Sequence, residues 1–151
     1  MTWLSLSGIV WEKPLPALEE FPEASKPGAG VYRLIASDIK GHPISISRVC
    51  GEDRSGTLYI GMAESLEVRV NELRKTLRPE MWKGGRHGAG LLLRRTDKMR
   101  SRFPNEHLST TWALADDPWD VEAELIKSYV REFGEGPPLN RQRSTPDHDQ
   151  D

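Results

Sequence analysis

The chain has 151 residues, of which 36% are hydrophobic and 29% charged, and its formal net charge is −2, as is typical of one soluble globular domain. No apolar run approaches the roughly 20 residues that a membrane-spanning helix needs, so we expect no membrane association. Cys50 is the single cysteine, which excludes an intrachain disulfide, and the N-terminus lacks the pattern of a secretory signal, so we expect a cytoplasmic protein.

The small net charge hides an asymmetry along the chain. Residues 61–102 contain 11 Lys and Arg against 5 Asp and Glu, a net +6, whereas residues 103–151 contain 4 against 11, a net −7. A basic middle segment can attract phosphates. A charge run is equally typical of a solvated surface, so charge alone does not identify a partner.

The first half of the chain predicts an arm followed by strands. Residues 1–27 contain four prolines and two tryptophans, which predicts an extended arm with its apolar residues packed on the domain. Residues 31–36 and 57–61 have strand composition, and residues 44–47 alternate like a strand or strand edge. A turn is expected at 38–43 and a loop at 51–56.

The second half predicts two helices and one strand. Ser65 is a good N-cap for a helix over 65–78, whose apolar residues recur at helical spacing. Residues 82–90 are rich in glycine, and residues 108–114 have strand composition. Asp117-Pro118 is typical of a helix start, which predicts a helix over 118–133. Residues 143–151 are predicted to be a disordered acidic tail.

Glu122 is the most informative residue on physical grounds. It precedes Leu125 by three positions, Ile126 by four and Tyr129 by seven, so it falls within the apolar stripe of its helix. A carboxylate turned toward a core is costly unless a cation, a donor or water accompanies it. At the rim of a cleft it would be a natural Mg²⁺ ligand. The alternative is a glutamate that turns to the helix edge and caps its own helix.

Four further side chains are weaker candidates when each is taken alone. Arg69 lies at the border of the apolar stripe of its helix, where a cation can reach a ligand or form a structural ion pair. Tyr32 and Tyr59 lie in predicted strands, where tyrosines are common core residues. His87, in the glycine-rich stretch, is either an acid/base group or an exposed loop histidine.

Taken together, these residues resemble the GIY-YIG nuclease domain over residues 28–142. The motifs that carry the resemblance are Gly30-Val31-Tyr32, Tyr59-Ile60-Gly61, Arg69 eight residues after the second motif, and Glu122 to Tyr129 leading to Pro138-Leu139-Asn140. The resemblance implies an α/β (α+β) fold, with a small three-stranded antiparallel sheet flanked by helices. It also implies a DNA endonuclease that hydrolyses phosphodiester bonds with one divalent metal ion, Mg²⁺ or Mn²⁺.

By position, the resemblance assigns roles to individual residues. Glu122 matches the metal-binding glutamate and Arg69 the arginine that binds the scissile phosphate. Tyr32 and Tyr59 match the two tyrosines of the site, one of which activates the attacking water. Asn140 matches a supporting asparagine, and His87 matches a histidine that assists the tyrosine in some relatives. Arg86, beside His87, is an additional candidate for substrate binding.

Two departures from the family pattern concern spacing. Residues 38–56 look like an insertion that adds a strand edge or contacts nucleic acid. The segment between Tyr129 and Asn140 is also stretched, so Asn140 is the weakest assignment.

Two alternatives to an autonomous nuclease stay open. One is a nucleic-acid-binding module that keeps the fold without cutting. The other is a nuclease that needs a protein partner, which would dock on the basic residues 83–102. A homodimer is also compatible with the sequence.

Overall fold

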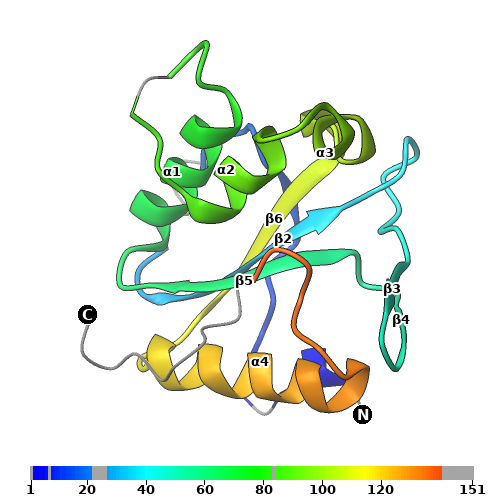
Figure 1. The fold of residues 1–151 in the computed structure, drawn as a ribbon. Helices are drawn as coiled ribbons and strands as arrows, with labels where there is room; N and C mark the ends of the chain where they lie inside the picture. The colour runs from blue at the N-terminus through cyan, green and yellow to red at the C-terminus, as the bar shows by residue number, and fades with distance from the viewer. Residues whose placement is uncertain (1, 7, 22–26, 83, 141–151) are drawn as a thin grey trace, which may run out of the picture.

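The computed structural model describes residues 2–6, 8–21, 27–82 and 84–140 of the chain. In chain order its elements are η1 (Trp3–Ser5), β1 (Leu15–Pro16), β2 (Gly30–Ala36), β3 (Ile46–Arg48), β4 (Gly51–Asp53), β5 (Thr57–Ala63), α1 (Leu66–Leu77), α2 (Gly88–Arg94), α3 (Asp97–Arg102), η3 (Asn105–His107), β6 (Leu108–Leu114) and α4 (Pro118–Phe133). Figure 1 shows the main sheet as a central layer with α1, α2 and α3 above it and α4 below it. The expected mixed α/β class with a small antiparallel sheet is confirmed.

The main sheet has four antiparallel strands in the order β1-β6-β2-β5. The predicted strands at 31–36, 57–61 and 108–114 are confirmed as β2, β5 and β6. The expectation of a three-stranded sheet is wrong by one strand, because Leu15 and Pro16 of the arm pair with β6. Proline has no amide hydrogen to donate, but β1 lies at the sheet edge, where a missing donor is tolerated.

The N-terminal arm also covers a buried cation. The guanidinium carbon of Arg33 lies 4.6 Å from the ring centroid of Trp11 and 5.7 Å from that of Trp3. Burial lowers the pKa of Arg33 to about 10, although the negative charge of Asp53 acts in the opposite direction. The two arm tryptophans therefore pack on the sheet around a charged residue that the sequence pattern did not reveal.

Strand β2 is central, and all seven of its residues are buried. Side chains of a strand alternate between the two faces of the sheet. Tyr32 and Leu34 belong to the cores beneath α1 and α2, whereas Val31 packs in the core beneath α4. The sheet thus separates two apolar layers, and Tyr32 lies on the α1 side.

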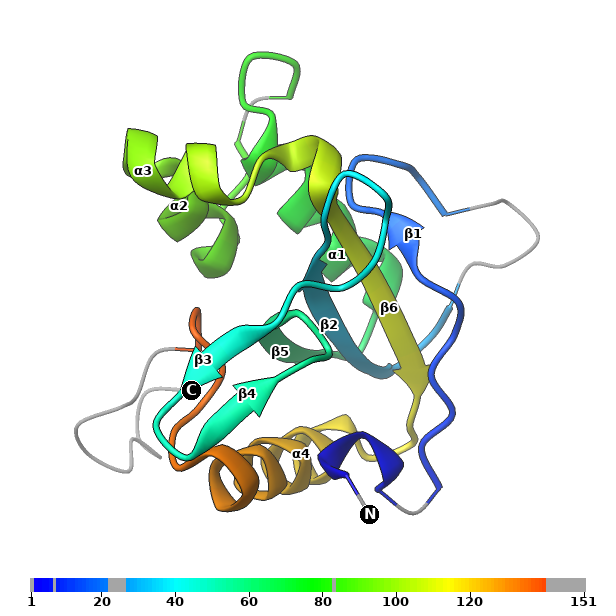
Figure 2. The ribbon, with the colours of Figure 1, turned by 90° about the vertical axis from the view of Figure 1, so that its right-hand side faces the viewer.

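Within residues 38–56, β3 and β4 form a hairpin separate from the main sheet. The loop expected over 51–56 is therefore wrong for residues 51–53, which pair with β3. The hairpin lies beside the C-terminal end of α4 in Figure 2, where the Cys50 amide donates to the Phe133 carbonyl at 2.9 Å. At its base, the Tyr129 hydroxyl donates to the buried Asp53 carboxylate at 2.8 Å.

Both predicted helices form, close to their expected bounds. The Ser65 hydroxyl accepts from the Val68 amide and caps α1, while the Asp117 carboxylate caps α4. The glycine-rich stretch leads at Gly88 into α2, which was not predicted as a helix. In the part of the chain that the structure describes, no helix is long and apolar enough to cross a membrane. The predicted tail at 143–151 lies outside the described residues.

Candidate active site

Tyr32 and Tyr59 come from neighbouring strands and lie on the same face of the sheet. Their ring centroids are 6.0 Å apart, and Tyr32 pairs across the ladder with Gly61. A Cβ atom on Gly61 would lie 2.6 Å from Cζ and Oη of Tyr32 and 2.7 Å from Cε2 of Tyr59. Because both rings lie over this residue, only glycine allows the pair to pack as it does.

His87 is the third member of the cluster, since its Nε2 lies 2.6 Å from the Tyr32 hydroxyl oxygen. It is completely buried, so the alternative of an exposed loop histidine is wrong. Burial, with the positive charge of Arg69, lowers the pKa of His87 to about 3, which keeps the ring neutral at pH 7. The cluster thus contains a neutral imidazole.

The hydrogen bonds of His87 define its tautomer. Its Nδ1 accepts from the Ala89 amide at 3.2 Å and must therefore carry a lone pair. The single proton of the neutral ring is then on Nε2, and this N–H donates to the oxygen of Tyr32. His87 is consequently a donor to Tyr32 and not its proton acceptor.

The glycines on either side of His87 allow its segment to pack closely on α1, and these glycines are visible in the sequence. The His87 amide donates to Thr76 Oγ1 of α1 at 2.9 Å. A Cβ atom on Gly85 would lie 2.4 Å from the Thr76 amide nitrogen, and one on Gly90 would lie 2.8 Å from Thr76 Cγ2. The glycine-rich stretch therefore packs on α1 in a way that side chains would prevent. Sequence reasoning missed Thr76, although these flanking glycines pointed to a close approach.

Arg69 is half-buried on α1, as its border position predicted, and it acts on both tyrosines. Burial raises the pKa of the Tyr32 hydroxyl, and nearby Tyr59 raises it further, whereas the charge and hydrogen bonding of Arg69 lower it. The two tyrosines also act on each other, and Arg69 lowers the pKa of Tyr59 as it does that of Tyr32. Since His87 donates to the Tyr32 oxygen, the hydroxyl hydrogen of Tyr32 is available to another acceptor.

The charge of Glu122, on α4, acts on Tyr59. Burial raises the pKa of Tyr59, and the negative charge of Glu122 is the next largest cause. Tyr59 lies on β5, an edge strand of the sheet. The N-cap of α4 is Asp117, whose carboxylate accepts from the Asp120 amide.

Asn140 supports the edge strand directly. Its side-chain oxygen accepts from the Ile60 amide at 2.9 Å, and its side-chain nitrogen donates to the Ile60 carbonyl at 2.8 Å. These bonds fix the backbone between Tyr59 and Gly61 despite the stretched spacing before Asn140. Arg86 is exposed, and no hydrogen bond or ion pair joins its guanidinium to another described residue, so the structure does not bring it into the cluster.

The residues of the cluster fit a metal ion held by one carboxylate. Within the described ranges, no group of three or more His, Cys, Asp and Glu side chains is arranged to hold an ion. Mg²⁺ commonly takes one or two carboxylates and completes its shell with water and substrate phosphates. Glu122, half-buried and close enough to act on Tyr59, is compatible with this kind of site.

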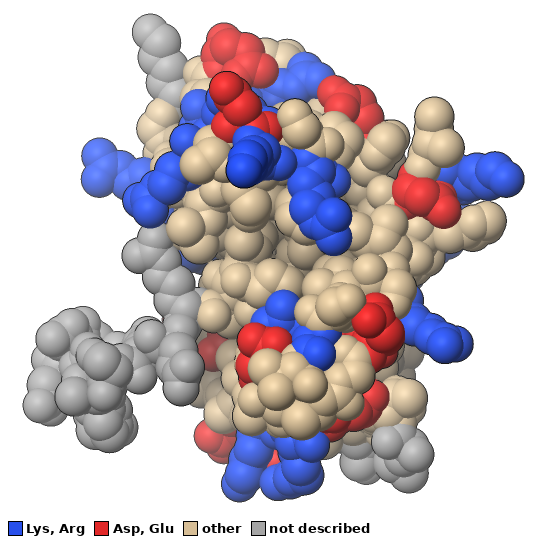
Figure 3. All heavy atoms as spheres, turned by 45° about the vertical axis from the view of Figure 1, so that its right-hand side comes forward, with Lys and Arg blue, Asp and Glu red and all other residues tan. Residues whose placement is uncertain are grey.

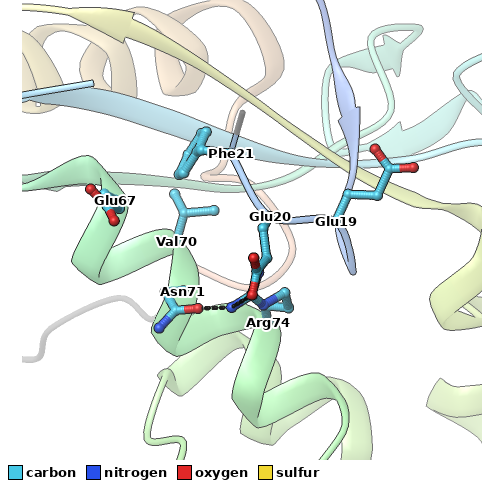
Figure 4. A pocket seen from close by; sticks show the side chains of 7 residues that line it. All are labelled: Glu19, Glu20, Phe21, Glu67, Val70, Asn71 and Arg74. Atoms are coloured by element: carbon cyan, nitrogen blue, oxygen red, sulfur yellow. Dashed lines mark hydrogen bonds and ion pairs between the residues drawn. The ribbon is translucent and has the colours of Figure 1, made fainter. Parts of the chain in front are cut away.

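A separate hollow of about 200 Å³ lies between the arm and α1 (Figure 4). It is lined by Glu19, Glu20, Phe21, Glu67, Val70, Asn71 and Arg74. Figure 4 shows Arg74 directed toward Asn71 and Glu20, and its Nη2 lies 3.4 Å from the Glu20 carboxylate. The hollow shares no lining residue with the tyrosine cluster, and its ion pair ties the arm to α1.

Comparisons of the chain with models of protein families, with curated proteins and with solved structures find no match in any of the three. The assignment of a function therefore depends on the residues of the chain itself.

Proposed function

We propose that the chain is a GIY-YIG-type endonuclease that hydrolyses DNA phosphodiester bonds with a divalent metal ion. The observation that carries the proposal is the convergence of two tyrosines, a neutral histidine, an arginine and a glutamate beside β5. These residues come from β2, β5, the segment before α2, α1 and α4, so no local structural need explains their meeting.

Phosphodiester hydrolysis needs a base, a cation that binds the phosphate and a site for a metal ion, and these side chains can supply all three. Water attacks phosphorus, a base accepts the proton of the water, and the bond to the leaving sugar oxygen breaks as that oxygen takes up a proton from solvent. Arg69, half-buried and acting on both tyrosines, would bind the phosphate oxygens, on which negative charge accumulates. A divalent ion at Glu122 would supply further positive charge and acidify a bound water.

Of the two tyrosines, we assign contact with the attacking water to Tyr59. Tyr32 is completely buried, whereas Tyr59 keeps part of its surface exposed. His87 donates to Tyr32, which leaves the Tyr32 hydroxyl hydrogen available to stabilise a negative charge on a nearby oxygen. In this assignment Tyr59 accepts the proton of the water as a phenolate, which Arg69 favours by lowering the pKa of Tyr59 against the burial that raises it.

The test is a cleavage panel on supercoiled, flapped, forked and single-stranded DNA with Mg²⁺ and with Mn²⁺. We expect the wild-type chain to cut at least one form, and Glu122→Gln, Arg69→Ala and Tyr59→Phe to lose about 10²-fold or more in rate. Tyr32→Phe, which removes a donor but not the proton acceptor, should keep more activity than Tyr59→Phe.

Glu124→Gln is the matched control, because this exposed carboxylate lies on the same helix as Glu122. It should cut at the wild-type rate. Intact DNA in every lane would contradict the proposal; binding without cleavage would favour the binding module, and cleavage only after cell extract is added would favour a required partner. Equal rates for Tyr32→Phe and Tyr59→Phe would refute the assignment of Tyr59.

A further inference from the structure

The surface of α2 and α3 is strongly basic and begins at the tyrosine cluster. Residues 86–102 contain six Lys and Arg against one acidic residue, a net +5. His87, which bonds to Tyr32, is the N-cap of α2, so the basic segment starts at the candidate site. Figure 3 shows Lys and Arg side chains, with some Asp and Glu among them, on the upper part of the molecule, where Figure 1 places these helices.

Three of these cations are available to an external partner. Arg95, Lys98 and Arg102 are exposed and form no ion pair with another described residue. Arg100 differs, since its guanidinium pairs with Asp97 and donates to the Arg94 carbonyl. The two kinds of cation on one short helix pair provide an internal comparison.

The other side of the candidate site has the opposite charge. Residues 115–135, which include α4, contain seven Asp and Glu against two Lys and Arg, a net −5. A polyanion that enters the site is therefore repelled along α4 and attracted along α2 and α3.

We propose that Arg95, Lys98 and Arg102 bind the phosphate backbone of DNA beyond the cleaved bond. The proposal rests on the proposed nuclease function, because the direction of the DNA along α2 and α3 is defined by cutting beside Tyr32 and His87. The seven residues of α2 and six of α3 measure about 10 Å and about 9 Å at 1.5 Å per residue. At about 3.4 Å of helix axis per phosphate of one strand, such a surface covers roughly three to six nucleotides on one side of the cut.

The experiment measures binding alone, with the full chain in EDTA so that no cutting occurs. A fluorescein-labelled 30-base-pair duplex is titrated at NaCl concentrations from 50 to 200 mM, and anisotropy gives the affinity. Because each phosphate contact contributes about 0.9 to the slope of log K against log salt, the triple variant R95Q/K98Q/R102Q should reduce that slope by about 2.7. The same relation gives affinity about 100-fold weaker at 0.15 M salt.

Two controls match the triple variant. K127Q/R131Q removes exposed cations from α4, and R100Q removes a cation already paired on α3. K127Q/R131Q should leave the duplex affinity within about twofold of wild type, and R100Q should reduce it less than any one of the three single changes. Circular dichroism melting checks that each variant is folded, since R100Q also loses the contacts with Asp97 and the Arg94 carbonyl.

The proposal is overturned if the triple variant binds duplex with wild-type affinity and slope, or if K127Q/R131Q weakens binding as much. It is also overturned if wild-type protein fails to bind duplex but binds polyglutamate through these residues, which would assign the surface to an acidic protein. The two proposals fail separately. Duplex binding that depends on these residues without any cleavage would refute the nuclease and keep the surface, and cleavage with an unaffected triple variant would do the reverse.

Discussion

Gly61→Ala tests the packing of the two tyrosines without altering a charged or catalytic group. The new Cβ would lie 2.6 Å from Tyr32, where ordinary carbon contacts fall at 3.4 to 4 Å, so the Tyr32 ring must retreat by about 1 Å. The backbone of Gly61 cannot yield instead, because it pairs with β2 in the middle of the ladder.

The size of the effect follows from what the ring would lose. A retreat of about 1 Å lengthens the 2.6 Å distance between Tyr32 and His87 beyond hydrogen-bonding range. Overpacking a core costs about 1–3 kcal/mol and the broken hydrogen bond about 1 kcal/mol, so we expect a loss of about 2–4 kcal/mol in unfolding free energy. If the chain is a nuclease, a displacement of this size should also lower the cleavage rate about 10²-fold.

Urea unfolding followed by tryptophan fluorescence gives the free energy, and Gly136→Ala is the control. A Cβ atom on Gly136 meets no atom within 4 Å, and its backbone does not require glycine, so this change should be nearly neutral. A Gly61→Ala variant within about 0.5 kcal/mol of wild type would refute the inference that both rings require glycine here.

Two further predictions concern the groups that surround the tyrosines. Because burial lowers the pKa of His87 to about 3 from an ordinary 6.5, the unfolded chain binds more protons between these values, and stability falls as pH drops through this window. At 1.36 kcal/mol per pH unit, about 2 kcal/mol of unfolding free energy is lost between pH 6.5 and 5. The matched variant is His87→Asn, which keeps a capping side chain, and the advantage of wild type over it in unfolding free energy should shrink by that amount between pH 7 and 5. An equal advantage at both pH values would contradict the prediction. Asn140→Ala leaves the Ile60 amide and carbonyl without their partners and should lower the unfolding free energy by about 1–3 kcal/mol, with a smaller loss for Asn140→Asp, which keeps the acceptor. Unchanged melting of both Asn140 variants would show that water replaces the side chain.

The local pattern of the sequence determined most of the regular structure. The strands β2, β5 and β6 and the helices α1 and α4 follow from composition, periodicity and caps, which act between residues close in the chain. The border position of Arg69 and the inward position of Glu122 follow from the same helical geometry. The nuclease resemblance added roles to these residues, and those roles stay predictions.

Only the tertiary structure decided how distant segments meet. Pairing of the proline-rich arm with β6, burial of Arg33 between two arm tryptophans, and the contact of the 38–56 hairpin with α4 depend on long-range packing. No local pattern encodes such contacts, because their free energy comes from surfaces that exist only after folding.

The candidate site shows the same division. The sequence identified His87 as a candidate but did not decide between an acid/base group and an exposed loop histidine, since a glycine-rich stretch allows both. Its burial, its neutral state and the direction of its hydrogen bond to Tyr32 follow from packing against Thr76 and from the Ala89 amide. The residue types are visible in the sequence alone, whereas the donation from His87 to Tyr32 was decided by tertiary contacts, because a proton's position depends on every partner around it.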